Sequence, residues 1–165
     1  MDNYGLAHKL GNNISTDDII AVKRKRDSLD MEKLTKYLFE DIDSFLRSKI
    51  KQGDYIVAGW NFGCGSSREA APLVILNSGV KAVIAKSFAR IFYRNAISIG
   101  LTLFECNTDD INDGDKIRLD LKSGKLLNVS KNRTYVGKPL PTFMLNILNS
   151  GGLISYLEGR DDFSL

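Results

Sequence analysis

Residues 61–72, NFGCGSSREAAP, bring together the side chains of this sequence that are best suited to chemistry. Two glycines flank Cys64, and glycine lets a backbone turn sharply and approach a ligand closely. Ser66 and Ser67 follow at the expected start of a helix, where unpaired amides favour an anion. Arg68 adds a planar fork that fits a carboxylate or a phosphate. The stretch therefore predicts a small-anion site formed by Ser66, Ser67 and Arg68.

A structural interpretation of the same stretch is a tight turn with a serine N-cap, in which Glu69 complements the helix dipole. Two phosphate-binding motifs are excluded by spacing. A P-loop needs Lys-Ser or Lys-Thr after its glycines, and the dinucleotide motif needs a third glycine where Arg68 or Glu69 stands.

Composition limits the remaining classes. The 165 residues, 43% of them hydrophobic, predict one domain spanning residues 1–165. A net charge of +3, with one basic run at residues 23–26, argues against nucleic-acid binding. No apolar run reaches membrane length and no signal pattern opens the chain, so we expect a cytoplasmic protein with no membrane partner.

Metal chemistry is limited by the scarcity of soft ligands. The chain has two cysteines, Cys64 and Cys106, and one histidine, His8. An iron–sulfur cluster needs about three or four thiolates, and a Cys/His zinc site needs a comparable set. We therefore expect no metal and no cofactor bound by this chain alone; a partner would have to bring the metal.

The hydrophobic pattern of the chain predicts the helices and strands that position these residues. Strand-like runs at 54–60, 80–86 and 101–105 alternate with helical stretches at 67–79 and 87–100, which indicates a parallel sheet. Further elements are a turn-rich segment at 10–22, an amphipathic helix at 30–50 with its stripe in the core, an antiparallel hairpin at 115–130, and C-terminal helices at 141–159 broken at Gly151–Gly152. The predicted class is α/β, mostly parallel, with an added antiparallel β-rich part.

The helix predicted at 87–100 carries two arginines at helical spacing. Arg90 and Arg94 share one face, which either lines a cleft or forms structural salt links. Phe88, Ile91 and Phe92 are expected in the core.

Three segments resemble one family. The stretch NFGCGSSRE, followed by GVKAVIAKSFARIFYRNAISIGL at residues 79–101, is similar to the small subunit of 3-isopropylmalate dehydratase, and GNNISTDDII at residues 11–20 resembles that family's opening motif. The resemblance covers about residues 10–22 and 55–106. It implies the fold of the swivelling C-terminal β/β/α domain of the aconitase superfamily.

The resemblance also implies a function. Family members isomerise a hydroxy acid by dehydration and rehydration, with a [4Fe-4S] cluster in a separate large subunit. It assigns Ser66 as the general base, Arg68 as a carboxylate ligand and Ser67 to the wall of the site, while Thr16 and Asp17 support a neighbouring loop. We expect a hetero-oligomer with the large subunit, and self-association of the isolated chain.

Substrate choice stays open at residues 21–27, a loop that selects the substrate's side group in the family. Isopropylmalate follows from the overall resemblance. Arg26 or Arg24 would instead suit the third carboxylate of homocitrate or a citrate-type substrate; dimethylmalate is a further alternative, and the basic run alone is typical of a solvated loop. Two family positions differ, at Trp60 and Ala70. The rival classes are an RNA-binding module and a structural subunit without catalysis.

Overall fold

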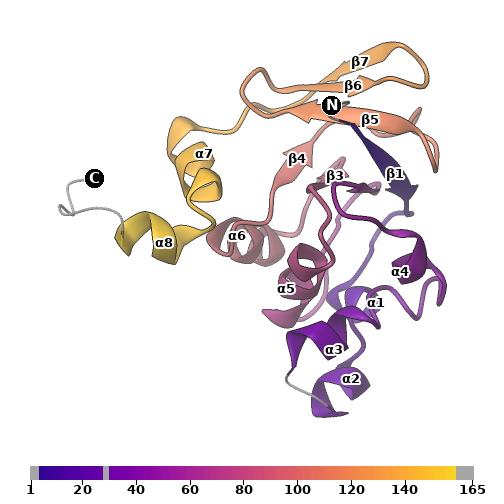
Figure 1. Cartoon of the computed structure of the whole chain (residues 1–165), viewed down its shortest axis with the longest axis vertical. Helices are drawn as coiled ribbons and strands as arrows, with labels where there is room; N and C mark the ends of the chain where they lie inside the picture. Colours follow the sequence, from indigo (N-terminus) through magenta and orange to yellow (C-terminus); the bar gives the residue numbers. More distant parts are fainter. Residues whose placement is uncertain (1–3, 28–29, 159–165) are drawn as a thin grey trace.

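The computed structural model describes residues 4–27 and 30–158, with the side chains of residues 25–27 left out. It contains a seven-stranded sheet in the order β4-β3-β2-β1-β5-β6-β7 (Figure 1). The strands are β1 (Gly5–Lys9), β2 (Tyr55–Val57), β3 (Ala82–Ala85), β4 (Leu103–Glu105), β5 (Lys116–Asp120), β6 (Lys125–Asn128) and β7 (Arg133–Val136). The first four strands pair in parallel and the last three are antiparallel. The predicted α/β class with an antiparallel addition is confirmed.

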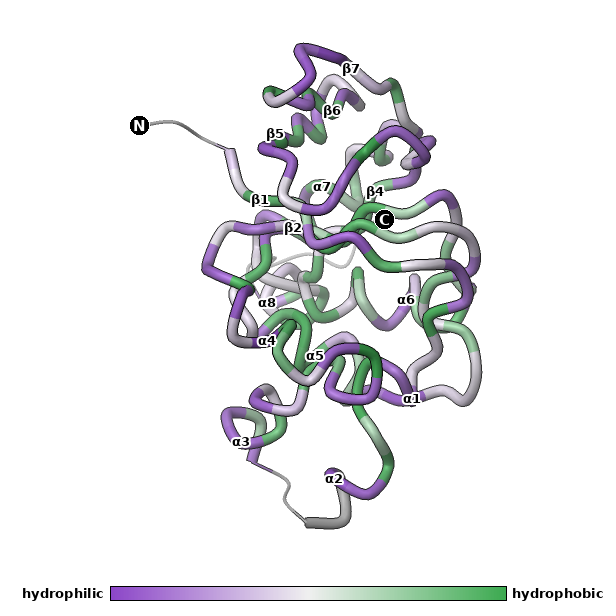
Figure 2. The backbone as a smooth tube through the Cα atoms, turned by 90° about the vertical axis from the view of Figure 1, so that its right-hand side faces the viewer, coloured by the Kyte–Doolittle hydropathy of each residue, from purple (hydrophilic) through white to green (hydrophobic). Residues whose placement is uncertain are grey.

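Both faces of the parallel strands are covered, which explains their continuous apolar sequences. Alternate side chains of β2 enter different cores: Ile56 packs with the helices, whereas Tyr55 and Val57 face the antiparallel strands. All residues of β2 and β3 are buried. Figure 2 shows apolar colouring concentrated where these strands meet α5, and hydrophilic colouring at the ends of the molecule.

The antiparallel strands curl back over the parallel ones. Leu126 of β6 and Tyr135 of β7 pack in the same cluster as Ile84 of β3 and Phe104 of β4, although β7 and β4 are at opposite ends of the strand order. The chain that leaves β7 returns to β4, where the Lys138 amide donates to a backbone carbonyl of that strand at 3.1 Å. The sheet is therefore close to a closed barrel.

The helices of the described chain are α1 (Thr16–Ile19), α2 (Val22–Asp27), α3 (Met31–Thr35), α4 (Leu46–Lys49), α5 (Ala70–Asn77), α6 (Arg90–Ser98), α7 (Thr142–Asn149) and α8 (Leu153–Glu158). The prediction of one helix at 30–50 is wrong: α3 and α4 are separated by turns. Phe39 is fully buried with a φ of 59°, and its amide donates to the carbonyl of Ile19 at 3.0 Å, which interrupts the helix. The predicted core stripe is also wrong at Phe45, which is 71% exposed.

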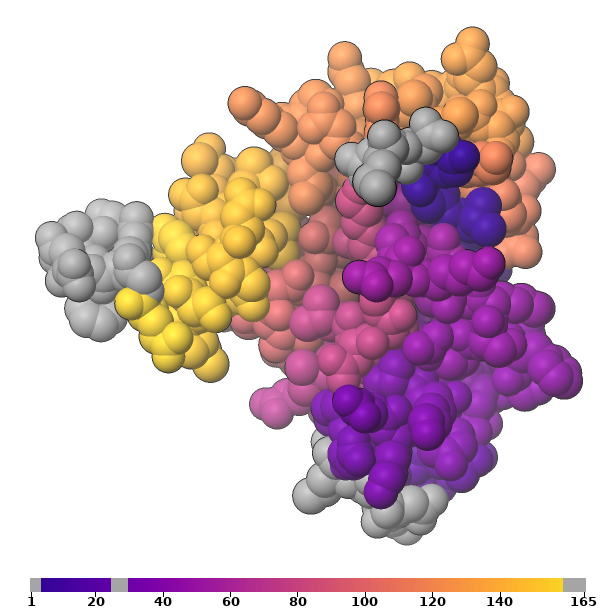
Figure 3. Space-filling view, in the orientation of Figure 1, coloured from indigo at the N-terminus to yellow at the C-terminus, as the bar shows by residue number. Residues whose placement is uncertain are grey.

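Other boundaries differ from the sequence-based expectations. Strands β1 and β7 were not predicted, and the basic run expected as a solvated loop lies in α2. The predicted hairpin and the break at Gly151–Gly152 are both present, and α7 and α8 project from the body of the molecule (Figure 3). Within residues 4–27 and 30–158, no helix has the length and apolar character needed to span a membrane.

Candidate functional site

The site is built by three loops that leave the carboxyl ends of β1, β2 and β3. These loops continue the parallel pairing beyond the strands, with isolated bridges between Ser15 and Cys64 and between Phe62 and Phe88. The Gly63 amide donates to the carbonyl of Ile14 at 2.7 Å, and the Phe62 amide donates to that of Ser87 at 3.0 Å. In parallel sheets, ligands bind at this edge. The backbone ladder thus holds the 63–68 turn between its two neighbours.

Glycine is required at the centre of this turn. Gly63 has a φ of +80°, and a Cβ built there would lie 2.2 Å from Cγ of Phe92. The turn therefore packs directly on α6, and this contact brings the loop after β2 against the helix after β3.

A capped helix supports the turn from the β1 side. Ser15 and Asp18 form a reciprocal capping box at the start of α1. Thr16, the residue after Ser15, is 2% exposed, and its hydroxyl donates to the backbone carbonyl of Ser66 at 2.8 Å. Thr16 thus contacts the turn through the backbone of the serine that the sequence singled out; its supporting role stays a prediction.

Arg68, the arginine of the turn, uses only part of its hydrogen-bonding capacity. Nη2 of Arg68 donates to Oδ2 of Asp17 at 2.9 Å, while Nε of Arg68 is buried without a hydrogen-bond partner. Ser66 and Ser67 are exposed, and no partner of the Ser66 hydroxyl occurs among the described residues. The Nε–H of the partly buried Arg68 and the hydroxyl of the exposed Ser66 thus have no hydrogen-bond partner among the described residues.

The predicted start of the following helix is wrong. Helix α5 begins at Ala70, and its N-cap is Glu69, whose side chain makes no capping hydrogen bond. Ser66 and Ser67 therefore precede the helix and do not cap it, so the serine-cap interpretation is also wrong. Ala70 is 2% exposed, packs in the hydrophobic core and does not line the cavity.

A cavity of 480 Å³ opens beside the turn. Its walls come from the turn, from the N-terminal part of α6 with its N-cap, and from the start of α1. The lining residues are Thr16, Gly63, Gly65, Ser66, Ser67, Arg68, Ala89, Arg90, Ile91, Phe92, Arg94 and Asn95. The lining contains three arginines and no carboxylate, so the cavity suits an anion.

Helix α6 supplies residues that the sequence analysis left open or missed. Arg90 and Arg94 line the cavity and form no ion pair within the part of the chain that the structure describes. Ile91 was expected in the core but is 56% exposed at the cavity. Asn95, which also lines the cavity, was missed; it directly follows Arg94 on α6, and no sequence signal marks it.

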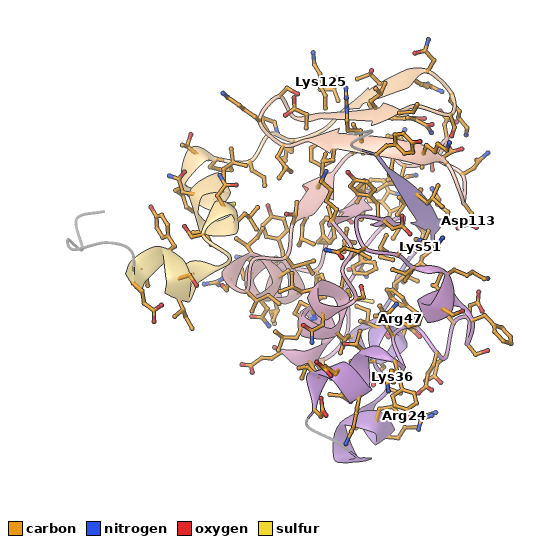
Figure 4. The ribbon with its side chains drawn as sticks, in the orientation of Figure 1. Arg24, Lys36, Arg47, Lys51, Asp113 and Lys125 are labelled. Carbon is orange, nitrogen blue, oxygen red and sulfur yellow. The ribbon has the colours of Figure 1, made fainter. Side chains whose placement is uncertain are left out.

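The basic segment at 21–27 lies apart from this cavity. Nε and Nη2 of Arg24 donate to the carboxylate of Glu40 at 2.8 and 2.9 Å, and the guanidinium stacks 3.9 Å from the centre of the Tyr37 ring. Figure 4 places Arg24 at the α2 end of the molecule, and it does not line the cavity. This geometry argues against Arg24 as a carboxylate ligand. The side chain of Arg26 lies outside the described residues.

The donor set of the chain does not fit an iron–sulfur cluster. Burial raises the pKa of the Cys106 thiol to about 12, which disfavours the thiolate that a metal needs. Cys64 is half-buried in the turn, with Sγ 3.5 Å from the carbonyl of Asn13. Among residues 4–27 and 30–158, no group of three His, Cys, Asp or Glu side chains is placed to hold a metal ion.

Fold and site together define a class: an α/β domain with an arginine-lined cavity at the carboxyl ends of its parallel strands. Residues 4–108 match the family model described as Aconitase C-terminal domain. The 3-isopropylmalate dehydratase small subunit of Caldicellulosiruptor saccharolyticus is 51% identical over 158 residues, 94% of this chain and 91% of the relative. The 3-isopropylmalate dehydratase small subunit 2 of Archaeoglobus fulgidus is 47% identical over 165 residues, 100% of both chains.

Structural comparison agrees. The crystal structure of 3-isopropylmalate dehydratase (leuD) from Methanocaldococcus jannaschii matches with a TM-score of 0.91 at 46% identity, covering 95% of this chain and 93% of that one. The chain belongs to the aconitase C-terminal domain family, among its 3-isopropylmalate dehydratase small subunits. The family resemblance found in the sequence is confirmed.

Proposed function

We propose that this chain is the small subunit of a 3-isopropylmalate dehydratase, a hydro-lyase that interconverts 2-isopropylmalate and 3-isopropylmalate in leucine biosynthesis. The proposal is carried by one observation: a chain that matches small subunits of that name over nearly its whole length also has an arginine-lined cavity beside Ser66. The cavity lining contains three guanidinium groups and no acidic residue, and this charge suits a hydroxy acid with two carboxylates.

In the proposed mechanism Ser66 acts as an alkoxide base. It removes the proton from the carbon next to a substrate carboxylate, and the electron pair of that C–H bond becomes the new C=C bond as hydroxide leaves the neighbouring carbon. The guanidinium of Arg68, which lines the cavity, binds a carboxylate, and the positive charge of the cavity favours the alkoxide. Ser67 lines the site, with Thr16 and Asp17 holding the turn and the guanidinium.

The remaining part of the active site comes from a partner. A large subunit carries the [4Fe-4S] cluster, which supplies the Lewis acid for the departing hydroxyl when bound. The two cysteines of this chain cannot replace it. The hetero-oligomer is cytoplasmic, and this chain alone is inactive.

The test is reconstitution with the cluster-loaded large subunit under anaerobic conditions. Dehydration of 3-isopropylmalate and of homocitrate is followed by ultraviolet absorbance. We expect turnover of 3-isopropylmalate by the complex and by neither subunit alone. Ser66→Ala should lower kcat by about 10²- to 10⁴-fold, the range for loss of a general base.

The matched control is Ser67→Ala, which removes a hydroxyl from the next position, where the serine is also exposed. It should lower the rate only slightly, with complex formation measured for each variant. Full activity of Ser66→Ala, or an equal loss in Ser67→Ala, would refute the assignment of the base. Preference for homocitrate would show that homocitrate, and not 3-isopropylmalate, is the substrate. Arg26 would then be the candidate ligand for its third carboxylate.

A further inference from the structure

We propose that Arg90 and Arg94 bind the second carboxylate of the substrate, on the α6 wall of the cavity. This inference rests on the proposed function and deepens it. The turn provides one carboxylate ligand, Arg68, whose fork already shares one nitrogen with Asp17. A substrate with two carboxylates needs a second cationic group, and the described cavity lining supplies it from α6.

The fold places both residues, which are exposed, in the N-terminal part of α6. Phe92, Ala96 and Ile97 are buried and attach the helix to the core. Arg90 is the first residue of the helix and Arg94 lies one turn later. Because helical side chains lean toward the N-terminus, the side chain of Arg94 lies over the turn that carries Arg90. Both residues line the 480 Å³ cavity.

This arrangement of charges is unfavourable without an anion. Like charges four residues apart on a helix repel each other. Cations are also disfavoured at a helix N-terminus, where the dipole is positive. The first turn of α6 contains no acidic residue, and its N-cap, Ala89, has no side-chain capping bond. Neither arginine has an ion pair in the described chain, so a bound carboxylate would offset all of these repulsions.

The dimensions and lining of the cavity agree with a small dicarboxylate. Its volume lies in the usual range for small-ligand sites, about 300–1,000 Å³. Ile91 and Phe92 add apolar surface to the lining of the cavity. The side group of isopropylmalate is apolar, so charged ends with apolar lining match its chemistry.

The kinetic test uses the complex with the large subunit and 3-isopropylmalate as substrate. Arg90→Gln/Arg94→Gln should raise KM by about 10- to 100-fold with a smaller change in kcat, since hydrogen bonds to a charged group bind ground state and transition state alike. Arg90→Gln/Arg94→Lys should raise KM less than the double Gln variant, because it keeps one of the two charges. Arg118→Gln is the matched control: Arg118 is exposed on β5 and lines no part of this cavity.

A second measurement reads binding without turnover. The ¹⁵N-labelled chain alone is titrated with 3-isopropylmalate, and the side-chain Nε–H signals of Arg90 and Arg94 should shift together with the amides of the first turn of α6. In the double Gln variant the first-turn shifts should disappear, while in Arg118→Gln they should persist.

The outcomes separate this inference from the proposed function. An unchanged KM in the double variant, with normal turnover by the unaltered complex, would overturn the second carboxylate site and leave the function intact. A rate loss restored by excess large subunit would show that the arginines bind an acidic surface of the partner, and would also overturn it. Signal shifts at α6 of the chain alone, together with a complex that does not turn over 3-isopropylmalate, would support the site and refute the function.

Discussion

The 63–68 turn depends on the absence of one side chain. Gly63 combines a φ of +80° with direct contact between its backbone and the Phe92 ring, so a methyl group there meets both a backbone penalty and a clash. Gly114 provides a comparison, because its φ of +79° is nearly the same and a Cβ would meet nothing within 4 Å. The two positions separate conformational cost from crowding.

We predict that Gly114→Ala lowers the free energy of unfolding by about 1–2 kcal/mol, the cost of a left-handed backbone with a Cβ. Gly63→Ala should lower it by more, and should also lower kcat, because the turn must move away from α6 and carry Ser66 with it. Urea unfolding of the isolated chain and turnover of the reconstituted complex measure the two effects. Equal losses of stability with full activity would contradict the proposed packing constraint.

At the scale of elements, Asp54 joins β1 to the start of β2. Its carboxylate accepts from the Leu6 amide and from the Lys51 amide, both at 2.9 Å, and lies 2.8 Å from Nε2 of His8. Burial opposes ionisation of Asp54, but the hydrogen bonds outweigh it and hold the pKa of this carboxyl below its ordinary value of 3.8. The charged form therefore stabilises the parallel pair.

The sign of the pH dependence follows. The contribution of Asp54 is present at pH values well above 3.8 and is lost as pH falls through the lower pKa of the folded state. We predict that Asp54→Asn is less stable than the unaltered chain at pH 7 and that the difference shrinks at pH 3. Urea unfolding at both pH values measures it. Asp41→Asn, which alters an exposed pair with Lys23, should show no such convergence.

The elements that sequence patterns predict well are those with continuous apolar runs or strong turn signals. The buried strands β2 and β3 and the Gly151–Gly152 break belong to this group. The segment at 30–50 does not, because its helical spacing persists while one buried, left-handed residue, Phe39, ends the helix through a contact with Ile19. That contact joins residues distant in sequence, which local periodicity does not report.

In the candidate site, too, local patterns could be predicted from the sequence and contacts between distant segments could not. Ser66, Ser67 and Arg68 stand out by type and spacing, and the structure brings them to one cavity. The contribution of α6 could not be decided, because Arg90 and Arg94 have the same spacing in a structural salt link as in a ligand site. Only the placement of β3 beside β2 brings that helix to the turn.

At the scale of the whole molecule, the C-terminal helices carry exposed apolar side chains. Ile154 is 72% exposed on α8, which has no buried residue, and Phe143 is 56% exposed on α7. Exposed apolar patches of this kind favour association. We therefore expect this surface to carry the self-association predicted for the isolated chain.

We predict that Ile154→Ser weakens concentration-dependent self-association of the isolated chain, as measured by sedimentation velocity. Val136→Ser is the matched control, because Val136 is 74% exposed but lies on β7. Equal effects of the two substitutions would show that any exposed apolar residue contributes to association, and would contradict a specific role of α8. If the unaltered chain is monomeric at all concentrations, the predicted self-association is wrong.

The ladder of loops that holds the site has a consequence for the order in which the chain is made. Its backbone partners, from Ile14 to Ala89, and the cavity lining that ends at Asn95 all precede the strands β5–β7. A nascent chain released from the ribosome tunnel as far as β4 already contains every residue of the cavity, but the second face of its parallel strands still lacks Leu126 and Tyr135. During synthesis, the part of the chain that forms the cavity therefore emerges before the antiparallel strands that cover the second face of its parallel strands.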